Sequence, residues 1–291
     1  MKKSDRIITV IVAAFLIILF IVLYSGINAK KFQYSSDFSK GQIAVVKLRG
    51  VIVSPDKIVN QLSKFSRRKD IKAIVLRIDS PGGGVAASQE IYEAVKRVRD
   101  SGKPIVASIA SLGASGGYYV ALGANRIMAN PGSITGSIGV IVNFPLVVDF
   151  LDKIGVEFKT VKSGNYKDLG SPYREFTDKD SAKLKEVVDD LFNQFVDVVA
   201  EERHLDKNDL LKLADGRIFT GSQAVEYSLV DTLGTFEDAI LLAGKMAGIE
   251  GRPKVIFSKR KKVSLIDILF SDIEEVLSIL TPIPSLNYLC R

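Results

Sequence analysis

Residues 73–110 read AIVLRIDSPGGGVAASQEIYEAVKRVRDSGKPIVASIA, and this stretch decides the fold. Its first part, 73–79, is rich in β-branched residues and predicts a buried strand that ends in a glycine-rich turn. Apolar residues at helical spacing then predict a helix that begins at an N-cap Ser88 and closes at Gly102. A second strand follows at 105–110. This order is that of a βαβ unit, which predicts parallel strand pairing.

Short strands continue to alternate with helices on both sides of this unit. Further strands are predicted at 43–48, 126–129 and 158–164, with a short extension at 51–53. Further helices are predicted at 56–66, 118–124, 145–155, 177–205, 209–213, 222–227 and 236–247. We therefore expect one α/β domain over 41–250, built of repeated βαβ units and ending in a helical C-terminal portion.

Composition limits the kinds of function that the chain can have. With 291 residues and 47% hydrophobic content, the chain is long enough to bury a substantial core. The net charge of +7 comes from basic residues spread along the sequence, so a solvated basic surface is favoured over nucleic-acid binding. Cys290 is the only cysteine, which excludes an intramolecular disulfide, a cysteine-rich zinc site and a two-cysteine redox motif. No metal or cofactor is predicted.

The N-terminus carries a candidate membrane anchor. Residues 7–24 form an uncharged apolar run of 18 residues, preceded by Lys2, Lys3 and Arg6. The run predicts a transmembrane helix, with a cleaved signal peptide as the alternative. We therefore expect an anchor over 1–24, a polar tether over 25–40, and a single-pass protein of the cytoplasmic membrane. The basic N-terminus places the domain on the extracytoplasmic side.

The segment GASGGYY at 113–119 carries the candidate nucleophile. Ser115 falls where a strand gives way to a helix, and its small neighbours let a substrate approach closely. The Gly116 N–H at this helix start could stabilise an oxyanion. The alternative is an ordinary N-cap serine. His204 is the only histidine and has charged neighbours that predict exposure, so a Ser-His-Asp arrangement is disfavoured.

Two further loops supply groups that such a serine would need. DSPGGG at 79–84 presents glycine N–H groups, and Gly83 could be the second oxyanion donor, although a plain turn is equally open. KSGNYKDLGSP at 162–172 offers Lys167 as a base. A free lysine has a pKa of about 10.4, so a lysine base must lose hydration, and the Asp168 carboxylate must point elsewhere. The alternative is a solvated surface lysine.

The motifs DSPGGG, ASLGASGGYYVALGA, PGSITGSIGVI, KSGNYKDLGSP and DGRIFTGSQAVEYSLVD occur in this order and together resemble the single-length signal peptide peptidase A family. The resemblance covers about 41–247. It implies a crotonase-like fold, shared with the caseinolytic proteases, and a Ser-Lys protease. The matching positions imply Ser115 as nucleophile, Lys167 as general base, Gly83 and Gly116 as oxyanion donors, and Ser137 as a support for the lysine.

The same resemblance implies the partners. Family members form ring-shaped oligomers and degrade remnant signal peptides at the cytoplasmic membrane, and the lysine of single-length members can come from a neighbouring subunit. Two alternatives remain open at this point. One is a crotonase-like enzyme acting on acyl-CoA, and the other is a catalytically silent membrane scaffold.

The C-terminal region 251–291 follows a different pattern. A basic cluster at 258–262 is followed by a candidate amphipathic helix at 264–280 and then by TPIPSLNYLCR, which its two prolines make extended. This tail could lie as a strand in a peptide groove and act as a self-inhibitory pseudo-substrate. A disordered end or a membrane-surface segment is the alternative.

Overall fold

A computed structural model of the protein describes residues 41–258 and 286–290. The predicted anchor and tether at 1–40 and the predicted amphipathic helix at 264–280 lie outside the described residues. Within the two described ranges, no helix combines the length and the apolar character that a bilayer span requires.

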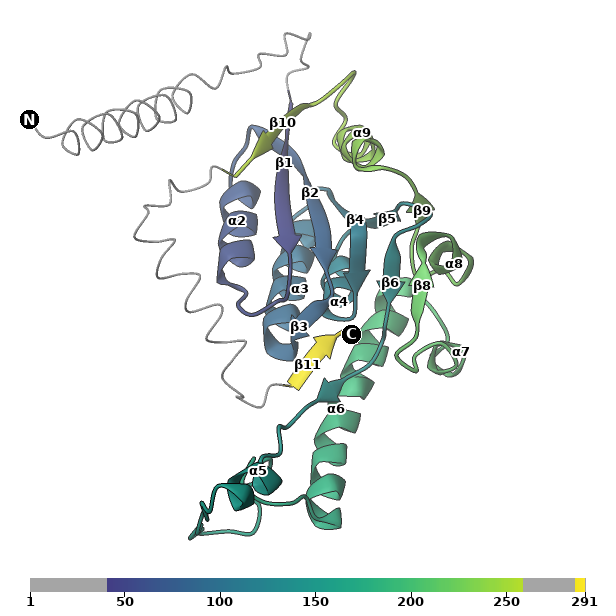
Figure 1. Cartoon of the computed structure of the whole chain (residues 1–291). Helices are drawn as coiled ribbons and strands as arrows, with labels where there is room; N and C mark the ends of the chain where they lie inside the picture. Colours follow the sequence, from purple (N-terminus) through teal and green to yellow (C-terminus); the bar gives the residue numbers. More distant parts are fainter. Residues whose placement is uncertain (1–40, 259–285, 291) are drawn as a thin grey trace, which may run out of the picture. The chain divides into compact units, whose positions relative to one another are not determined.

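Eleven strands and eight helices make up this part of the chain (Figure 1). The strands are β1 Gln42–Arg49, β2 Ile71–Ser80, β3 Gly82–Gly84, β4 Ile105–Ala114, β5 Arg126–Ala129, β6 Ile134–Gly136, β7 Ile141–Val142, β8 Ile218–Thr220, β9 Thr232–Leu233, β10 Lys254–Phe257 and β11 Leu286–Leu289. The helices are α2 Asp56–Ser66, α3 Val85–Asp100, α4 Gly116–Leu122, α5 Val148–Lys153, α6 Asp178–Arg203, α7 Lys207–Leu211, α8 Gly221–Glu226 and α9 Phe236–Met246.

The main sheet has the strand order β10-β1-β2-β4-β5-β9, and every neighbouring pair along this path is parallel. Strand β4 changes partner along its length, because residues 106–109 pair with β5 and residues 112–114 pair with β6. Strand β6 also pairs antiparallel with β8. A second, small sheet has the order β3-β11-β7. The predicted α/β class with largely parallel strands is confirmed.

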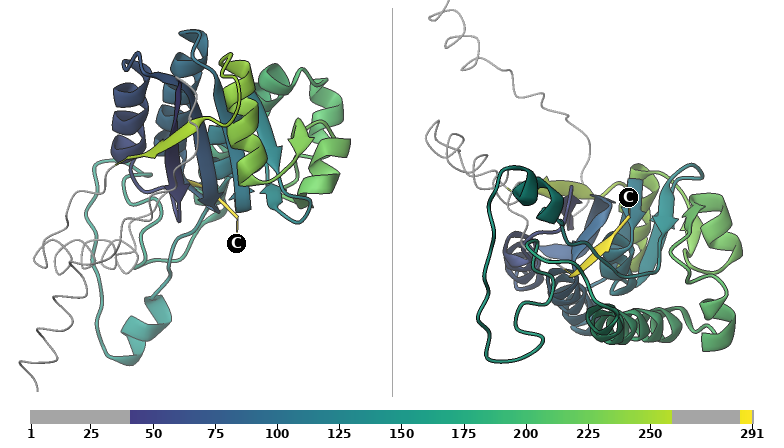
Figure 2. Two further views of the ribbon diagram at one scale, coloured as in Figure 1. Left: turned by 90° about the horizontal axis from the view of Figure 1, so that it is seen from above. Right: turned by 60° about the horizontal axis from the view of Figure 1, so that its bottom comes forward.

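Both faces of the main sheet are covered by helices (Figure 2). In β1, Ile43 and Val45 belong to the apolar cluster that contains α9, whereas Ala44, Val46 and Leu48 belong to the larger cluster that contains α2, α3 and α4. Alternation of side chains across a strand sends successive residues to opposite layers. A strand that is buried on both faces therefore reads as a continuous apolar run.

Two local expectations are wrong. Helix α3 begins at Val85, three residues before the predicted N-cap Ser88, whose hydroxyl instead donates to Gly84 O at 2.9 Å within the first turn. Residues 156–162 form no strand, and their side chains are exposed, although the β-rich composition of 158–164 predicted one. A strand needs a neighbour for its backbone groups, and no strand of the described part of this chain lies beside that segment.

Candidate active site

Ser115 occupies the sharp corner between β4 and α4. Its φ is +53°, in the left-handed region that non-glycine residues rarely adopt. Its N–H donates to Gly136 O at 2.8 Å, and its carbonyl accepts from Tyr119 N at 2.8 Å. Backbone strain of this kind persists only where the surrounding structure holds it, and it is frequent at catalytic positions.

The Ser115 hydroxyl is buried but makes no hydrogen bond that would stabilise the fold. The side chain is 1% exposed, and Oγ has no hydrogen-bond partner among the described residues. Although Ser115 stands at the N-cap position of α4, its side chain forms no capping bond, which counts against the ordinary N-cap interpretation. A buried hydroxyl without a partner costs about 1–3 kcal/mol, so its presence requires an explanation.

The glycine loop meets this corner through its backbone. An ideal Cβ on Gly116 would lie 3.2 Å from Gly83 N, so the two predicted oxyanion donors are neighbours. Gly82 lies closer still, since its ideal Cβ would meet Gly116 N at 2.7 Å. The loop is anchored by Ser80, whose Oγ accepts from Gly82 N at 3.2 Å and donates to Gly50 O at 2.6 Å.

Gly82 was not predicted as a site residue. Its φ is +101°, and its ideal Cβ would also lie 1.9 Å from Tyr288 O, so only glycine fits there. The run of three glycines indicated a close backbone approach, but glycines carry no side-chain signal that distinguishes one from the next.

Gly82→Ala is expected to lower the catalytic activity, measured as kcat/KM, about 100-fold, because the new methyl displaces Gly116 N, one of the two expected oxyanion donors. Steady-state kinetics would measure kcat/KM, and thermal melting would show whether the variant is folded. Gly102→Ala is the matched control, since Gly102 has a similar φ of +82° and no heavy atom within 4 Å of its ideal Cβ. Full activity in Gly82→Ala would contradict the placement of this loop in the site.

Ser137 directly follows β6, the strand that pairs with β4 next to the Ser115 corner. Register pairs Ala114 with Gly136, so Ser115 and Ser137 follow paired positions of β4 and β6. Ser137 is 8% exposed, has a φ of +51°, and donates its N–H to Arg217 O at 2.8 Å. The structure thus brings together four of the five predicted site residues: Ser115, Gly116, Gly83 and Ser137.

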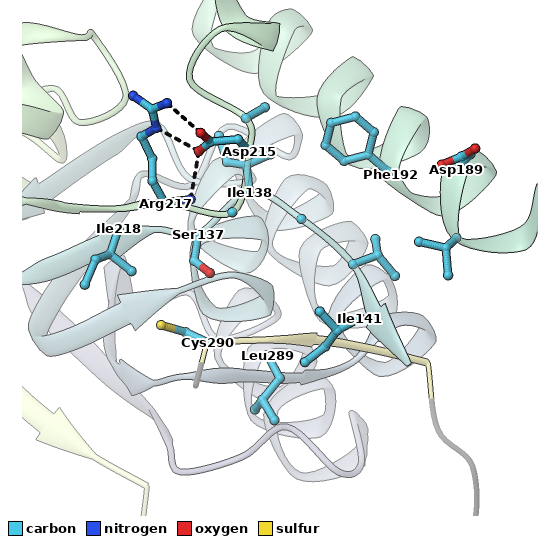
Figure 3. A pocket seen from close by; sticks show the side chains of 15 residues that line it. Ser137, Ile138, Ile141, Asp189, Phe192, Asp215, Arg217, Ile218, Leu289 and Cys290 are labelled. Atoms are coloured by element: carbon cyan, nitrogen blue, oxygen red, sulfur yellow. Dashed lines mark hydrogen bonds and ion pairs between the residues drawn. The ribbon is translucent and has the colours of Figure 1, made fainter. Parts of the chain in front are cut away.

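Of these four residues, Ser137 lines a pocket of about 740 Å³ (Figure 3). Ser137 is part of its wall, together with apolar residues such as Ile138 and Ile141. Leu289 and Cys290, from the C-terminal tail, line it as well. The volume and the largely apolar lining are typical of a pocket that takes substrate side chains.

Lys167 is the predicted site residue that this chain does not bring to Ser115. It lies in the segment 143–177, here named the arm, which also contains α5 and leads into α6 (Figure 1). The Lys167 side chain is exposed. The backbone N–H of Lys167 donates to Gly164 O at 3.1 Å. The partnerless Ser115 Oγ excludes a hydrogen bond between the two side chains within the described chain.

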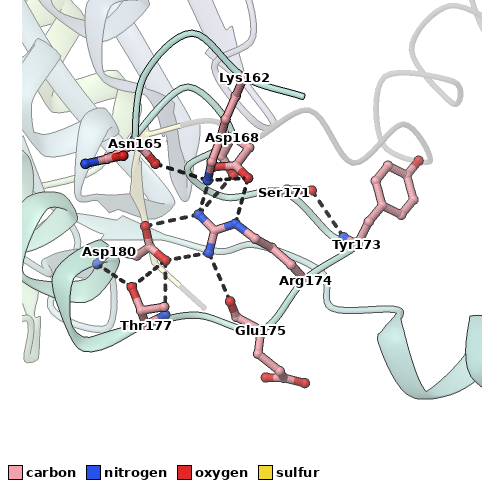
Figure 4. Close-up of polar contacts among 9 residues, drawn as sticks. All are labelled: Lys162, Asn165, Asp168, Ser171, Tyr173, Arg174, Glu175, Thr177 and Asp180. Atoms are coloured by element: carbon pink, nitrogen blue, oxygen red, sulfur yellow. Dashed lines mark hydrogen bonds and ion pairs between the residues drawn. The ribbon is translucent and has the colours of Figure 1, made fainter. Parts of the chain in front are cut away.

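The carboxylate next to Lys167 binds other side chains, which meets the condition that a Lys167 base sets. Asp168 accepts from Lys162 Nζ at 2.7 Å and from Arg174 Nε at 2.9 Å, and Arg174 also binds Asp180 (Figure 4). Hydrogen bonds from Arg174, and next those from Lys162, lower the pKa of Asp168 to about 2. The network fixes the fold of the arm around Lys167.

Asp168→Asn is expected to loosen the arm, so that trypsin cuts within 143–177 several-fold faster at pH 7. Because the folded pKa is lowered to about 2, the carboxylate contributes fully above about pH 4, and its contribution is lost as the pH falls toward 2. Glu157→Gln is the control, since Glu157 forms only a long 3.9 Å pair with Lys159. Equal digestion of all three proteins would show that the network does not order the arm.

Comparisons with known proteins agree with this geometry. A family model described as Peptidase family S49 matches residues 97–250, more than half of the chain, and a Clp protease model matches residues 42–134. A putative protease of Synechocystis sp. is 45% identical over 213 residues, which cover 73% of this chain and 76% of that protein.

Two other relatives carry more specific names. A putative signal peptide peptidase SppA of Enterococcus faecium is 40% identical over 182 residues, covering 62% of this chain and 53% of the relative. The chloroplastic serine protease SPPA of Arabidopsis thaliana is 30% identical over 262 residues, which cover 84% of this chain and 38% of that protein. The chain therefore spans about half, or less, of the length of these two proteins.

The parallel sheet, the strained serine corner and these matches define a serine protease with an α/β fold like that of the Clp proteases. The chain belongs to peptidase family S49, the family of signal peptide peptidase A. This membership favours a peptidase over the acyl-CoA enzyme and over the silent scaffold. His204, exposed at the C-terminal end of α6, is not part of the site.

Proposed function

We propose that the protein is a membrane-anchored endopeptidase that degrades remnant signal peptides and other hydrophobic peptides with a Ser115/Lys167 dyad. One observation carries the proposal: a buried Ser115 Oγ without a hydrogen-bond partner in the described chain, on the residue before Gly116, whose backbone lies beside Gly83. Such an arrangement supports a hydroxyl kept available for a base and a substrate.

In the proposed mechanism, the neutral amine of Lys167 takes the proton of Ser115 Oγ as the oxygen bonds to the scissile carbonyl carbon. The N–H groups of Gly83 and Gly116 stabilise the resulting oxyanion, each by about 3 kcal/mol. The lysine then gives its proton to the leaving amine as the peptide bond breaks. Water, deprotonated by the same lysine, releases the acyl group, and Ser137 helps to hold the lysine in place.

The lysine is proposed to come from a neighbouring subunit of a ring-shaped oligomer. The arm that carries Lys167 exposes large apolar side chains, including Phe150 at 62%, Phe158 at 51% and Val161 at 101%. Apolar exposure of this extent on one segment supports a protein contact there. Burial of the arm against another copy would also remove water from Lys167, as a lysine base requires.

The proposed organisation has an anchor over 1–24, a tether over 25–40, the protease domain over 41–250 and a tail region over 251–291. The anchor would hold the protease domain on the extracytoplasmic side of the cytoplasmic membrane, where hydrophobic peptide remnants lie. The apolar run at 7–24 and the basic residues Lys2, Lys3 and Arg6 before it support this placement.

Labelling with a fluorophosphonate activity probe tests the proposal directly. The intact, detergent-solubilised protein is expected to be labelled at Ser115, and both Ser115→Ala and Lys167→Ala are expected to lose the label. A label on another residue, or undiminished labelling of Lys167→Ala, would refute the assigned dyad.

A further inference from the structure

The edge of the main sheet at which the parallel strands begin is here named the entry edge. Gly41 is the first described residue, and Gln42 opens β1 opposite Ile71, the first residue of β2. Ser115 follows the last residue of β4, so it lies at the opposite edge. At about 3.3 Å per residue, the ten residues of β4 separate the two edges by about 30 Å.

The entry edge carries a pocket between the end of α2 and the end of α3. The pocket has a volume of about 480 Å³. All charged residues of its described lining are cationic: Arg67, Arg68, Lys69, Lys72 and Lys103. Lys72 also lies where the chain enters the domain, since an ideal Cβ on Gly41 would be 3.2 Å from Lys72 Cγ. A concentration of positive charge therefore surrounds the entry of the chain.

Two of the five cations already have partners within the domain. Lys103 Nζ donates to the carbonyls of Phe65, Ser66 and Arg68 at 2.9, 2.8 and 2.9 Å. These bonds satisfy the carbonyls at the end of α2 and offset the negative end of its dipole. Arg68 pairs with Asp70 at 2.5 Å. Neither the helix end nor Asp70 is therefore left to neutralise the remaining cations.

The other three cations, Arg67, Lys69 and Lys72, are here named the basic patch. All three are exposed, and none forms an ion pair within the described residues. Lys254, also exposed, opens β10 opposite Gln42 and adds positive charge at the same edge. Like charges without partners repel one another, and an anionic surface relieves that repulsion.

We propose that the basic patch docks the protease domain on an anionic phospholipid surface. The inference rests on the membrane anchor of the proposed function and adds an orientation to it. The proposed tether of residues 25–40 joins the domain at Gly41, and its 16 residues reach at most about 55 Å. The tether thus keeps the entry edge, and with it the basic patch, within reach of the bilayer that holds the anchor.

A bilayer fits the basic patch better than a nucleic acid does. Proteins that bind single strands combine positive charge with aromatic stacking platforms, and the described lining of this pocket has no aromatic side chain. Close to an anionic membrane each lysine or arginine contributes about fivefold to binding, so three contribute roughly 100-fold. Docking in this way leaves Ser115 about 30 Å from the lipid surface. A peptide bond is then cut only after its segment has left the hydrocarbon region.

The chain contains no tryptophan, which permits a direct test on the full-length protein. Ser101→Trp places one fluorophore in the lining of the pocket without changing its charge. This protein is reconstituted in phosphatidylcholine vesicles with or without phosphatidylglycerol, both containing a dansyl-labelled headgroup. Energy transfer from the tryptophan to dansyl is expected to be strong only with phosphatidylglycerol and to fall at high salt.

Two charge-matched variants of the Ser101→Trp protein separate the patch from net charge. The patch variant combines Arg67→Gln, Lys69→Gln and Lys72→Gln. The control variant combines Lys47→Gln, Arg49→Gln and Lys57→Gln, which are exposed residues at the far end of β1 and the start of α2. The patch variant is expected to lose roughly 100-fold in the docking equilibrium constant. The control variant should match the parent, and probe labelling of Ser115 in detergent checks that both are folded.

Equal energy transfer with and without phosphatidylglycerol, or undiminished transfer in the patch variant, would overturn the inference. Tighter binding of a single-stranded oligonucleotide than of phosphatidylglycerol vesicles, measured with the same tryptophan, would overturn it as well. Failure of the full-length chain to float with neutral phosphatidylcholine vesicles would instead overturn the anchor of the proposed function.

Discussion

Replacing Ser115 by alanine is expected to lower kcat/KM for peptide hydrolysis by at least about a thousand-fold, because Ser115 Oγ is the only buried hydroxyl without a partner among the described residues, and it precedes Gly116 at the glycine loop. The stability of the folded protein should not decrease. Removing a buried hydroxyl that lacks a partner relieves an unfavourable term, so the melting temperature is expected to stay the same or to rise.

Ser111→Ala is the matched control, since Ser111 lies on the same strand β4 but is exposed. Its activity and melting temperature should equal those of the wild type. Two results would contradict the assignment: substantial hydrolysis by Ser115→Ala, or a fall in its melting temperature large enough to explain the lost activity. Kinetics on the detergent-solubilised chain together with calorimetry separate these outcomes.

Lys167→Ala is expected to lower kcat/KM by about a hundred-fold or more, the usual contribution of a general base. The source of the lysine can be found by mixing two inactive proteins. If each site takes Ser115 from one subunit and Lys167 from the next, hybrid rings of Ser115→Ala and Lys167→Ala regain up to about a quarter of the wild-type sites. If both come from one chain, mixing restores nothing.

The mixing experiment needs subunit exchange, which two differently labelled wild-type samples can report by energy transfer. Lys159→Ala is the control lysine, because Lys159 lies in the same arm with 83% of its side chain exposed. It should retain activity alone. Exchange without recovered activity would show that the dyad is not shared between subunits, and full activity of Lys167→Ala would remove this lysine from the mechanism.

The sheet and its helices could be predicted because their signals are local. Strands buried on both faces read as apolar runs, as in β1 and β2, and α6 carries an apolar face at helical spacing together with a Thr177 capping box. The position of Ser115 at a strand-to-helix corner was predicted for the same reason, since the small residues of such a corner are visible in sequence. The sequence reasoning required the Asp168 carboxylate to point away from Lys167, but it did not identify Lys162 and Arg174 as its partners.

The remaining features depend on contacts that sequence does not encode locally. Composition suggested a strand at 158–164, but pairing requires a neighbour that the described chain does not supply. Strand β10 was missed because it is short and half exposed and owes its place to β1. The close approach of Gly82 to Gly116 N is visible only in the folded chain, and the stacking of Tyr288 on Tyr119 joins residues about 170 positions apart along the chain.

Strand β11 lies between β3 and β7 and is covalently part of the protein that binds it, and this has a kinetic consequence. A tethered ligand acts at an effective concentration set by its linkage, so its occupancy does not fall when the protein is diluted. If substrate peptides use the path that β11 occupies, they must displace it, and their apparent affinity falls in proportion to the fraction of molecules in which that path is open. In that case, weakly binding sequences would be disfavoured at any enzyme concentration, without a separate inhibitor.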